Sequence, residues 1–492
     1  MSILPAGISA TLPAFAQSTL PRLLKHGANG FAAARGYHIY TELRLTKKAE
    51  VAETDSQALK FARAIDELVN HAVSASSLFN VVLLEAQGAV LHFFREGPLD
   101  ARNLKACLQF VSVFTSVVYD DLQDELGDDW QGFASCLDHG DAIIVAHKNV
   151  SSDSAVSLGP CANRPAKQLF YGPTPAGHLD IPGSFAPLLG QQCDTRWWSL
   201  NLRDRSRIPF STENENAELN RQFKETVRAF RNDTSRRRIE SIGALDNRVL
   251  FTGGYRIDSP KKLRVSGVRC DLDGFSAMVE AAFAAGPNAV HRAALGFAAI
   301  LDFGDYMQRN TPGAISLPWA GDCATTLLPD NPATVKGSLP AWLEFSMRWQ
   351  SFGRNTPGAL PDEWARELAK LSWAVGGVHG QTGFTIVLPI VAQGRQFLVG
   401  AGWPVAVSLD AQNEGQGGDI VTHRHDYNLL DSATQRLFRQ IGGKEFWKTR
   451  SITKEKLREA AIEAAESVKP SAADYLARAE TISIPSPRPH LR

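Results

Sequence analysis

The chain has 492 residues, equal numbers of basic and acidic residues (52 Lys and Arg, 52 Asp and Glu), and a hydrophobic fraction of 44%. This length suggests about two to four domains, and the apolar fraction excludes an intrinsically disordered chain. A net charge of zero argues against a protein whose main role is to coat nucleic acid or an anionic membrane.

The six cysteines are widely spaced and form no C-x-x-C pair. This argues against a zinc ribbon or a disulfide framework and is typical of reduced, cytosolic chains. No apolar run approaches the length of a membrane span. The N-terminal segment is interrupted by Pro5 and Pro13 and lacks the basic start of a secretory signal. We therefore expect a cytoplasmic protein.

The first half of the chain predicts a mixed succession of strands and helices. The β-branched and aromatic run 37–46 predicts a strand, and 59–73 has a helical apolar pattern. A hairpin over 80–94, a helix over 99–126, a strand over 133–140 and a Gly-Pro-containing segment over 158–169 follow in order.

The second half predicts the same succession more clearly. A strand over 264–271 runs into D-L-D-G-F-S, which turns at Gly274 into a helical pattern that continues to about Met307. Two short apolar runs surround Gly321-Asp322 and predict a hairpin with the acid at its tip. A helix over 339–352, a strand over 373–380, a strand around 397–400 and the segment from 406 complete the half.

The matching order indicates a distant internal duplication. The separation between matched positions rises steadily along the chain, as expected for one duplication followed by small loop changes. We predict a first domain over 36–170 and a second over 259–415. A linker over 171–258 with a charged helix, and a helical tail over 416–492, complete the expected organisation.

Two carboxylates of the second half have the arrangement of a divalent-metal site. Asp271 ends a strand and Asp322 lies at a hairpin tip, and hard cations on a nucleoside triphosphate prefer such oxygens. The backbone N–H groups of Gly274, Phe275 and Ser276 begin a helix and offer a seat for phosphate. Taken singly, each acid also fits a helix cap or a turn.

These motifs resemble class III nucleotide cyclases. The resemblance rests on D-L-D-G-F-S, the W-A-G-D hairpin, the H-G strand end and a G-x-x-x-N element, and covers roughly 36–170 and 260–410. It implies two ferredoxin-like α+β domains packed head to tail. Each site of that family takes two metal-binding aspartates from one domain, and a ribose-binding Asn and a transition-state Arg from the other.

Carried over residue by residue, the resemblance makes Asp271 and Asp322 the ligands of two Mn²⁺ or Mg²⁺ ions, with Leu272 beside them at the metal site. Asn163 matches the ribose-binding Asn. Lys167 stands where the family has Arg, which replaces a bidentate fork with a point charge.

The complementary positions are degraded. Glu42 and Gln87 stand at the metal positions of the first half, and Pro404 and Ser408 at the Asn and Arg positions of the second. One composite site is therefore expected to be functional and the other not. This predicts an intrachain pseudo-heterodimer with a single active site.

The positions that select a purine in the family fall at Leu83 and Val156, neither of which can read a purine edge. Cyclases without those selectors include the bacterial Pycsar pyrimidine cyclases, which make cyclic UMP or cyclic CMP in response to phage. The resemblance thus favours UTP as substrate and a separate cyclic-nucleotide effector as reader of the product. Tyr37 and Tyr40 are candidates to fill the space beside a smaller base.

Three alternatives remain open. A purine cyclase would use the same metal site with another base pocket. A diguanylate-cyclase or polymerase-palm relative also places acids after a strand and on a hairpin, although its hairpin would read G-G-[DE]-E-F. A catalytically dead nucleotide sensor would suit the loss of the family Arg.

Overall fold

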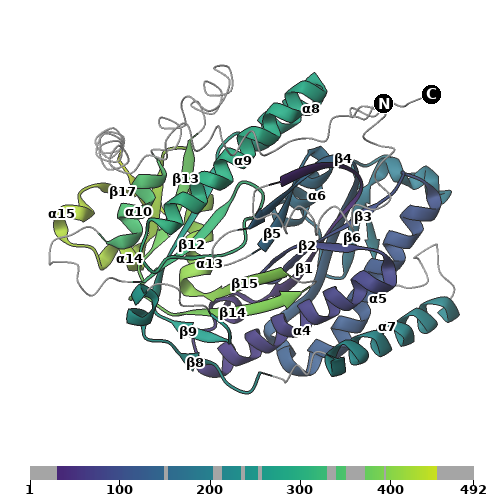
Figure 1. Cartoon of the computed structure of the whole chain (residues 1–492), viewed down its shortest axis with the longest axis horizontal. Helices are drawn as coiled ribbons and strands as arrows, with labels where there is room; N and C mark the ends of the chain where they lie inside the picture. Colours follow the sequence, from purple (N-terminus) through teal and green to yellow (C-terminus); the bar gives the residue numbers. More distant parts are fainter. Residues whose placement is uncertain are drawn as a thin grey trace.

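The computed structural model describes residues 30–148, 153–202, 213–233, 239–252, 257–329, 340–350, 372–392 and 395–450. They form a mixed α+β structure in which two large sheets, each with its own helices, lie on opposite sides of the molecule (Figure 1). None of the described helices is long and apolar enough to cross a membrane.

The first sheet has the strand order β2-β3-β1-β4-β6-β7, with β5 paired to β4. Helices α4 and α5 pack against each other, and α6 packs against β1 and β4. The elements of this half are β1 (Gly30–Leu45), α3 (Lys47–Val51), α4 (Asp55–Phe79), β2 (Val82–Gln87), β3 (Val90–Glu96), α5 (Ala101–Leu126), β4 (Trp130–Lys148), β5 (Asp153–Leu158), α6 (Pro160–Tyr171), β6 (His178–Pro182) and β7 (Trp197–Asn201).

The second sheet has the order β11-β12-β10-β13-β16-β18-β17. As in the first, a hairpin flanks the opening strand, and the next long strand pairs in parallel with a later one. Its elements are β10 (Val265–Leu272), α8 (Phe275–Ala285), α9 (Pro287–Arg309), β11 (Ile315–Ser316), β12 (Ala324–Pro329), α10 (Ala341–Trp349), β13 (Trp373–Val378), α13 (Trp403–Asn413), β16 (Ile420–His423), α14 (Arg424–Asn428), α15 (Ser432–Gln435), β17 (Phe438–Gln440) and β18 (Phe446–Thr449).

A smaller sheet of order β15-β14-β9-β8 contacts elements of both halves, among them α4 of the first and α13 of the second. It contains β8 (Gly243–Ala244), β9 (Lys261–Leu263), β14 (Thr385–Ala392) and β15 (Arg395–Gly402).

Alternation along β1 decides which side chains reach the site. Tyr37, Ile39 and Leu43 point into the hydrophobic core beneath α4 and α5. His38 and Tyr40 therefore face the opposite side of the sheet, where Tyr40 packs against Leu169 of α6. The sheet thus has one helix-covered apolar face and one face covered by α6.

Each half inserts a hairpin into the core of the other. Ile143 and Val156 of the β4–β5 hairpin pack with the residues of α8 and α9. In return, Ile386 and Leu388 of β14 pack with the core under α4 and α5. Because these apolar side chains are fully or almost fully buried, the two halves share their cores rather than meet at a polar surface.

Parts of the expected organisation are wrong. Residues 178–201 are not linker, because β6 and β7 extend the first sheet. Residues 420–449 are not a helical tail, because three strands separated by two short helices extend the second sheet there. Ile420 and Val421 are buried strand residues, and the helical pattern that suggested a tail lies in 451–492, outside the described residues, as does the N-terminal segment.

The charged helix expected in the linker is present as α7 (Glu213–Asp233). It packs along α4 and α5 through Phe223 and Val227, which are buried in the core of the first half (Figure 1). Its other faces carry ion pairs such as Arg221 with Glu218 and Glu225.

Candidate active site

Two aspartates of the second half meet at one end of its sheet. Asp271 lies near the end of β10, opposite Ala374 of β13. Asp322 occupies the turn between β11 and β12, which is closed by paired backbone hydrogen bonds of 2.9 Å between Ala320 and Cys323. Because β10 pairs with β12, this turn adjoins the end of β10.

The negative charges of Asp271 and Asp322 are disfavoured unless a cation lies near them. Burial and the neighbouring Asp271 raise the pKa of Asp322 well above its usual range, against the backbone N–H groups of Asp322 itself and Leu272. Burial likewise raises the pKa of Asp271, opposed by Arg269. Two half-buried carboxylates that disfavour each other's charge fit a divalent metal site, because hard cations prefer carboxylate oxygens.

Helix α6 of the first half begins at a glycine that no other residue can replace without strain. Gly159 has φ 154°, and a Cβ there would lie 2.8 Å from the carbonyl oxygen of Asp141 and 3.3 Å from the ring of Phe283 on α8. This close approach seats the start of α6 against the helix that follows Asp271.

Lys167 of α6 interacts electrostatically with both aspartates of the other half. Its ammonium lowers the pKa of Asp271 and of Asp322, so the three groups lie within Coulombic range of one another. Lys167 is exposed, and Asn163 lies half-buried one turn earlier on the same helix. The structure therefore places Lys167 near the two predicted metal ligands, with Asn163 one turn earlier on the same helix.

Two side chains missed by sequence reasoning also belong to this group. Partial burial and then Asp271 raise the pKa of the Tyr171 hydroxyl, with Asp322 also contributing, and Tyr171 follows Lys167 by one turn of α6. Arg269 lies two residues before Asp271 and donates to Thr325 Oγ1 at 3.4 Å. The i, i+4, i+8 spacing of Asn163, Lys167 and Tyr171 was the available signal.

The arginine next to this row cannot take the place of Lys167. Arg164 Nε lies 2.8 Å from Asp138 Oδ2 in an ion pair on β4. Burial raises the pKa of that carboxyl to about 6, with Arg164 opposing the shift. The Arg164 guanidinium thus points to β4 of the first sheet, where it pairs with Asp138.

The turn after Asp271 is built to hold the start of α8. Gly274 has φ 83°, a left-handed conformation that suits glycine, and caps the helix beginning at Phe275. Asp273 accepts a hydrogen bond from the backbone N–H of Gly417, which ties the turn to the loop before β16. The first N–H groups of α8, including that of Ser276, lack intrahelical partners and can bind an anion.

Three residues predicted to hold the base lie in hydrophobic cores. Tyr37 and Leu83 belong to the core beneath α4 and α5, and the Tyr37 hydroxyl donates to Pro98 O at 3.2 Å. Val156 belongs to the other core, with α8 and α9.

Tyr40 instead belongs to a buried polar group on the face that α6 covers. Its ring stacks on His92 with centroids 4.0 Å apart. His38 Nδ1 lies 3.1 Å from His92 Nε2, and His92 Nδ1 lies 3.6 Å from Glu85 Oε1. A register shift in β2 between Leu83 and Glu85 places Glu85 opposite His92.

The degraded positions of the first half serve packing. Glu42 pairs with Arg44 at 3.0 Å, and the same guanidinium donates to Leu169 O of α6 at 3.1 Å. The Gln87 amide donates to the carbonyl oxygen of Trp319, just before the turn that carries Asp322. The β2–β3 hairpin therefore contacts the β11–β12 hairpin through a hydrogen bond.

The degraded positions of the second half are also structural. Ser408 is buried, and its hydroxyl donates to Val405 O at 3.0 Å within α13. The carbonyl of Pro404 lies directly against Gly267 of β10. Neither residue offers a group suited to binding ribose or phosphate.

No family model matches the sequence, and no curated protein matches it. Among solved structures, a class III adenylyl cyclase-like ATP-binding protein from Pseudomonas aeruginosa is similar over 87% of this chain and 91% of its own, with a TM-score of 0.59 and 17% identity. The guanylyl cyclase Cya2 and the adenylyl cyclase CyaB of P. aeruginosa each match 39% of this chain with a TM-score of 0.27, at 15% and 12% identity. On the similarity to the P. aeruginosa ATP-binding protein, the chain thus has a class III nucleotide cyclase-like fold.

Proposed function

We propose that the chain is a nucleotidyl cyclase that converts a ribonucleoside triphosphate to its 3′,5′-cyclic monophosphate and pyrophosphate. The observation that carries this proposal is the approach of Lys167, from the first half, to Asp271 and Asp322, from the second. A cation near a pair of half-buried carboxylates suits a triphosphate with its metal ions.

Asp271 and Asp322, with the backbone of Leu272, would hold two Mn²⁺ or Mg²⁺ ions. When bound, such ions supply neutralisation of the phosphate charge and activation of a hydroxyl nucleophile. In the reaction, the ribose 3′-oxygen bonds to the α-phosphorus, the bond from that phosphorus to pyrophosphate breaks, and the hydroxyl proton is released to solvent.

The chain's own side chains orient the reacting groups. Lys167 stabilises the negative charge that develops on the α-phosphate, and Asn163 positions the ribose. The start of α8 at Gly274, Phe275 and Ser276 binds the phosphate tail through backbone N–H groups. Tyr171, at the exposed end of the row on α6, can donate a hydrogen bond to the same phosphates.

For the base, we propose a pyrimidine, with UTP favoured. Apolar Leu83 and Val156 stand where purine cyclases of this family carry polar selectors. The buried group of His38, His92, Glu85 and Tyr40 lies on the α6 face and offers hydrogen-bonding atoms for a small polar base. The product would serve as a second messenger in antiphage defence, read by a separate effector.

A second candidate is a nucleotide-binding protein without turnover. The solved structure with the same fold is described as ATP-binding and cyclase-like, and Lys167 replaces the arginine of active cyclases. Such a protein would bind ATP at the same aspartates and release no pyrophosphate.

Incubation with each ribonucleoside triphosphate and Mn²⁺, followed by mass spectrometry, separates the candidates. A cyclic pyrimidine monophosphate is expected, and a cyclic purine monophosphate would overturn the base assignment. A dinucleotide would favour the diguanylate-type alternative, and binding without product would favour the sensor. Asp322→Ala should abolish turnover, whereas Glu42→Gln, at the first-half position that matches Asp271, should preserve it.

A further inference from the structure

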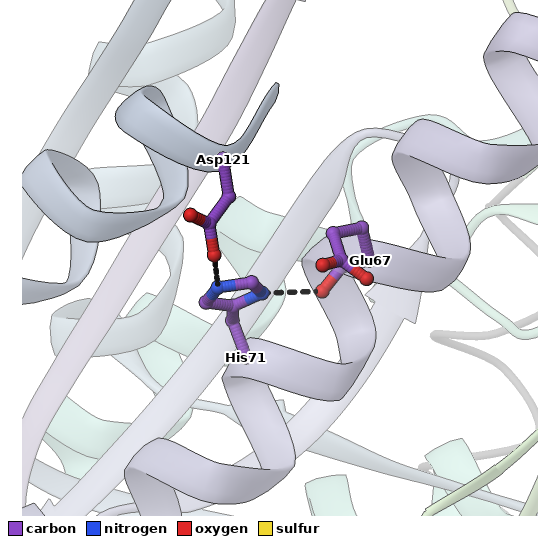
Figure 2. A group of neighbouring side chains, drawn as sticks. All are labelled: Glu67, His71 and Asp121. Carbon is purple, nitrogen blue, oxygen red and sulfur yellow. Dashed lines mark hydrogen bonds and ion pairs between the residues drawn. The ribbon is translucent and has the colours of Figure 1, made fainter. Parts of the chain in front are cut away.

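A second group of metal-ligating side chains lies between α4 and α5, in the first half and outside the candidate active site. Glu67 and His71 come from successive turns of α4, and Asp121 comes from α5 (Figure 2). One ligand atom of each lies within 4.8 Å of the other two. His71 is completely buried, and Asp121 is partly exposed.

The hydrogen bonds of His71 point to a cation. Its Nδ1 lies 2.8 Å from the backbone carbonyl oxygen of Glu67, and its Nε2 lies 2.9 Å from Asp121 Oδ2 (Figure 2). Both ring nitrogens thus face acceptors that cannot donate. Nδ1 must carry a hydrogen, and the lone pair of a neutral imidazole at Nε2 would repel the carboxylate. The contact therefore requires a positive species at Nε2, either a proton or a metal ion.

The position of Nδ1 is the one found in metal-binding histidines. A ligating imidazole typically donates its other N–H to a carbonyl or carboxylate, which fixes the ring and its tautomer. Here the Glu67 carbonyl does so, and the Glu67 side chain supplies a third ligand atom from the same turn. An i, i+4 pair on one helix with a carboxylate from its neighbour gives one nitrogen and two oxygen ligands.

Basic side chains of α7 lie near Asp121 and compete with a metal ion for its charge. Lys224 and Arg228 of α7 lower the pKa of Asp121, after the larger effect of the His71 hydrogen bond. The Lys224 ammonium donates to the adjacent Asp120 at 3.0 Å. Phe223 packs edge-on to the His71 ring at 5.9 Å and shields this side from water. Lys224 therefore forms its ion pair with Asp120, and Asp121 faces His71.

We propose that Glu67, His71 and Asp121 bind one divalent transition-metal ion of the Zn²⁺ type, which cross-links α4 and α5 beneath α7. Imidazole nitrogen with carboxylate oxygens favours Zn²⁺ over Mg²⁺ or Ca²⁺. The described residues supply three protein ligands, so water completes the coordination. The site is structural, and it is independent of the cyclase proposal.

The test measures Zn²⁺ binding by equilibrium dialysis and elemental analysis of the full chain. Asp271→Asn/Asp322→Asn serves as background, so that the proposed catalytic ions do not contribute. In that background, Asp121→Asn and His71→Gln remove one ligand each. Asp120→Asn makes the same exchange one residue away and is the matched control.

We expect one Zn²⁺ per chain, and Asp120→Asn should retain it. Asp121→Asn and His71→Gln should bind Zn²⁺ at least about tenfold more weakly. Loss even of a residue that only orients a metal ligand lowers metal affinity by about that factor. Zn²⁺ should also raise the melting temperature of the background protein but not of Asp121→Asn. Unchanged Zn²⁺ binding in Asp121→Asn would overturn the proposal. So would absence of Zn²⁺ binding with a proton on His71 Nε2 detected by nitrogen NMR, because the contact would then be a histidinium–aspartate ion pair.

Discussion

At the scale of single residues, the chemistry proposed for this protein depends most on Lys167. Its positive charge lowers the pKa of both aspartates of the other half. Lysine can neutralise phosphate charge but lacks the bidentate geometry of arginine. The active site is therefore expected to tolerate arginine at this position but no neutral side chain.

Lys167→Ala should lower kcat by about 100-fold or more with a smaller change in KM, because the lost interaction acts on charge formed in the transition state. Lys167→Arg should retain activity. Lys48→Ala, at an exposed position on α3, is the control. Steady-state pyrophosphate release measures all three, and full activity of Lys167→Ala would remove this residue from the mechanism.

The burial of His92 predicts that the stability of the protein depends on pH. Burial lowers its pKa to about 3, so the folded protein holds the neutral imidazole while the unfolded chain binds a proton below about pH 6.5. Stability from this group is therefore complete above pH 6.5 and is lost as the pH falls toward 3.

Between pH 6 and 4, the unfolding free energy of His92→Gln should depend on pH less steeply than that of the parent, by up to about 1.4 kcal/mol per pH unit. Urea titrations at several pH values measure this slope. The same exchange at half-buried His178 is the control, and equal slopes for His92→Gln and the parent would contradict the account.

At the scale of elements, the placement of α6 depends on Gly159. Alanine there would combine an unfavourable φ with overlap against Asp141 and Phe283. Gly88→Ala is the matched control, because Gly88 has φ 54° and open space where its Cβ would lie.

We expect Gly159→Ala to cost about 2 kcal/mol more than Gly88→Ala in urea unfolding, and to lower activity by displacing Asn163 and Lys167. Equal costs for the two variants would show that the contact with α8 is not restrictive.

The sequence allowed many elements to be predicted, and particular residues explain the failures. The hairpin that carries Asp322 is present where alternating apolar runs predicted it. A single helical pattern from Gly274 to Met307 is two helices, because Gly286 has φ 105° and Pro287 begins a new helix. Strand β14 was not predicted, and it contains Pro389, a residue that argues against the interior of a sheet because it cannot donate a backbone hydrogen bond.

The candidate site likewise contains residues that the sequence predicted and residues that it did not. Asp271 and Asp322 follow from local motifs, whereas Arg269 and Tyr171 join them only through strand pairing and the seating of α6. The bulge between Leu83 and Glu85 sets a limit on spacing arguments, because one inserted position in a strand exchanges its faces, and the sequence alone does not reveal where it lies.

At the scale of the whole molecule, the exchanged hairpins make the halves depend on each other. Ile386 of β14 is fully buried in the core of the first half. Ile386→Ala should therefore destabilise the chain by about 2–4 kcal/mol in one cooperative transition that includes both halves. Fluorescence and far-UV circular dichroism in urea measure it. Two separate transitions, with only the second half weakened, would contradict this interdependence.

The central claim is that one chain contains one complete active site, with Asn163 and Lys167 from the first half and the aspartate pair from the second. The most direct measurement mixes equal amounts of Asp271→Asn and Lys167→Ala chains and follows cyclic nucleotide formation from UTP with Mn²⁺, beside the unaltered protein. We predict activity for the unaltered protein and none above that of the separate variants for the mixture. Activity restored by mixing would place the site between two chains, and an inactive unaltered protein would contradict the proposed function.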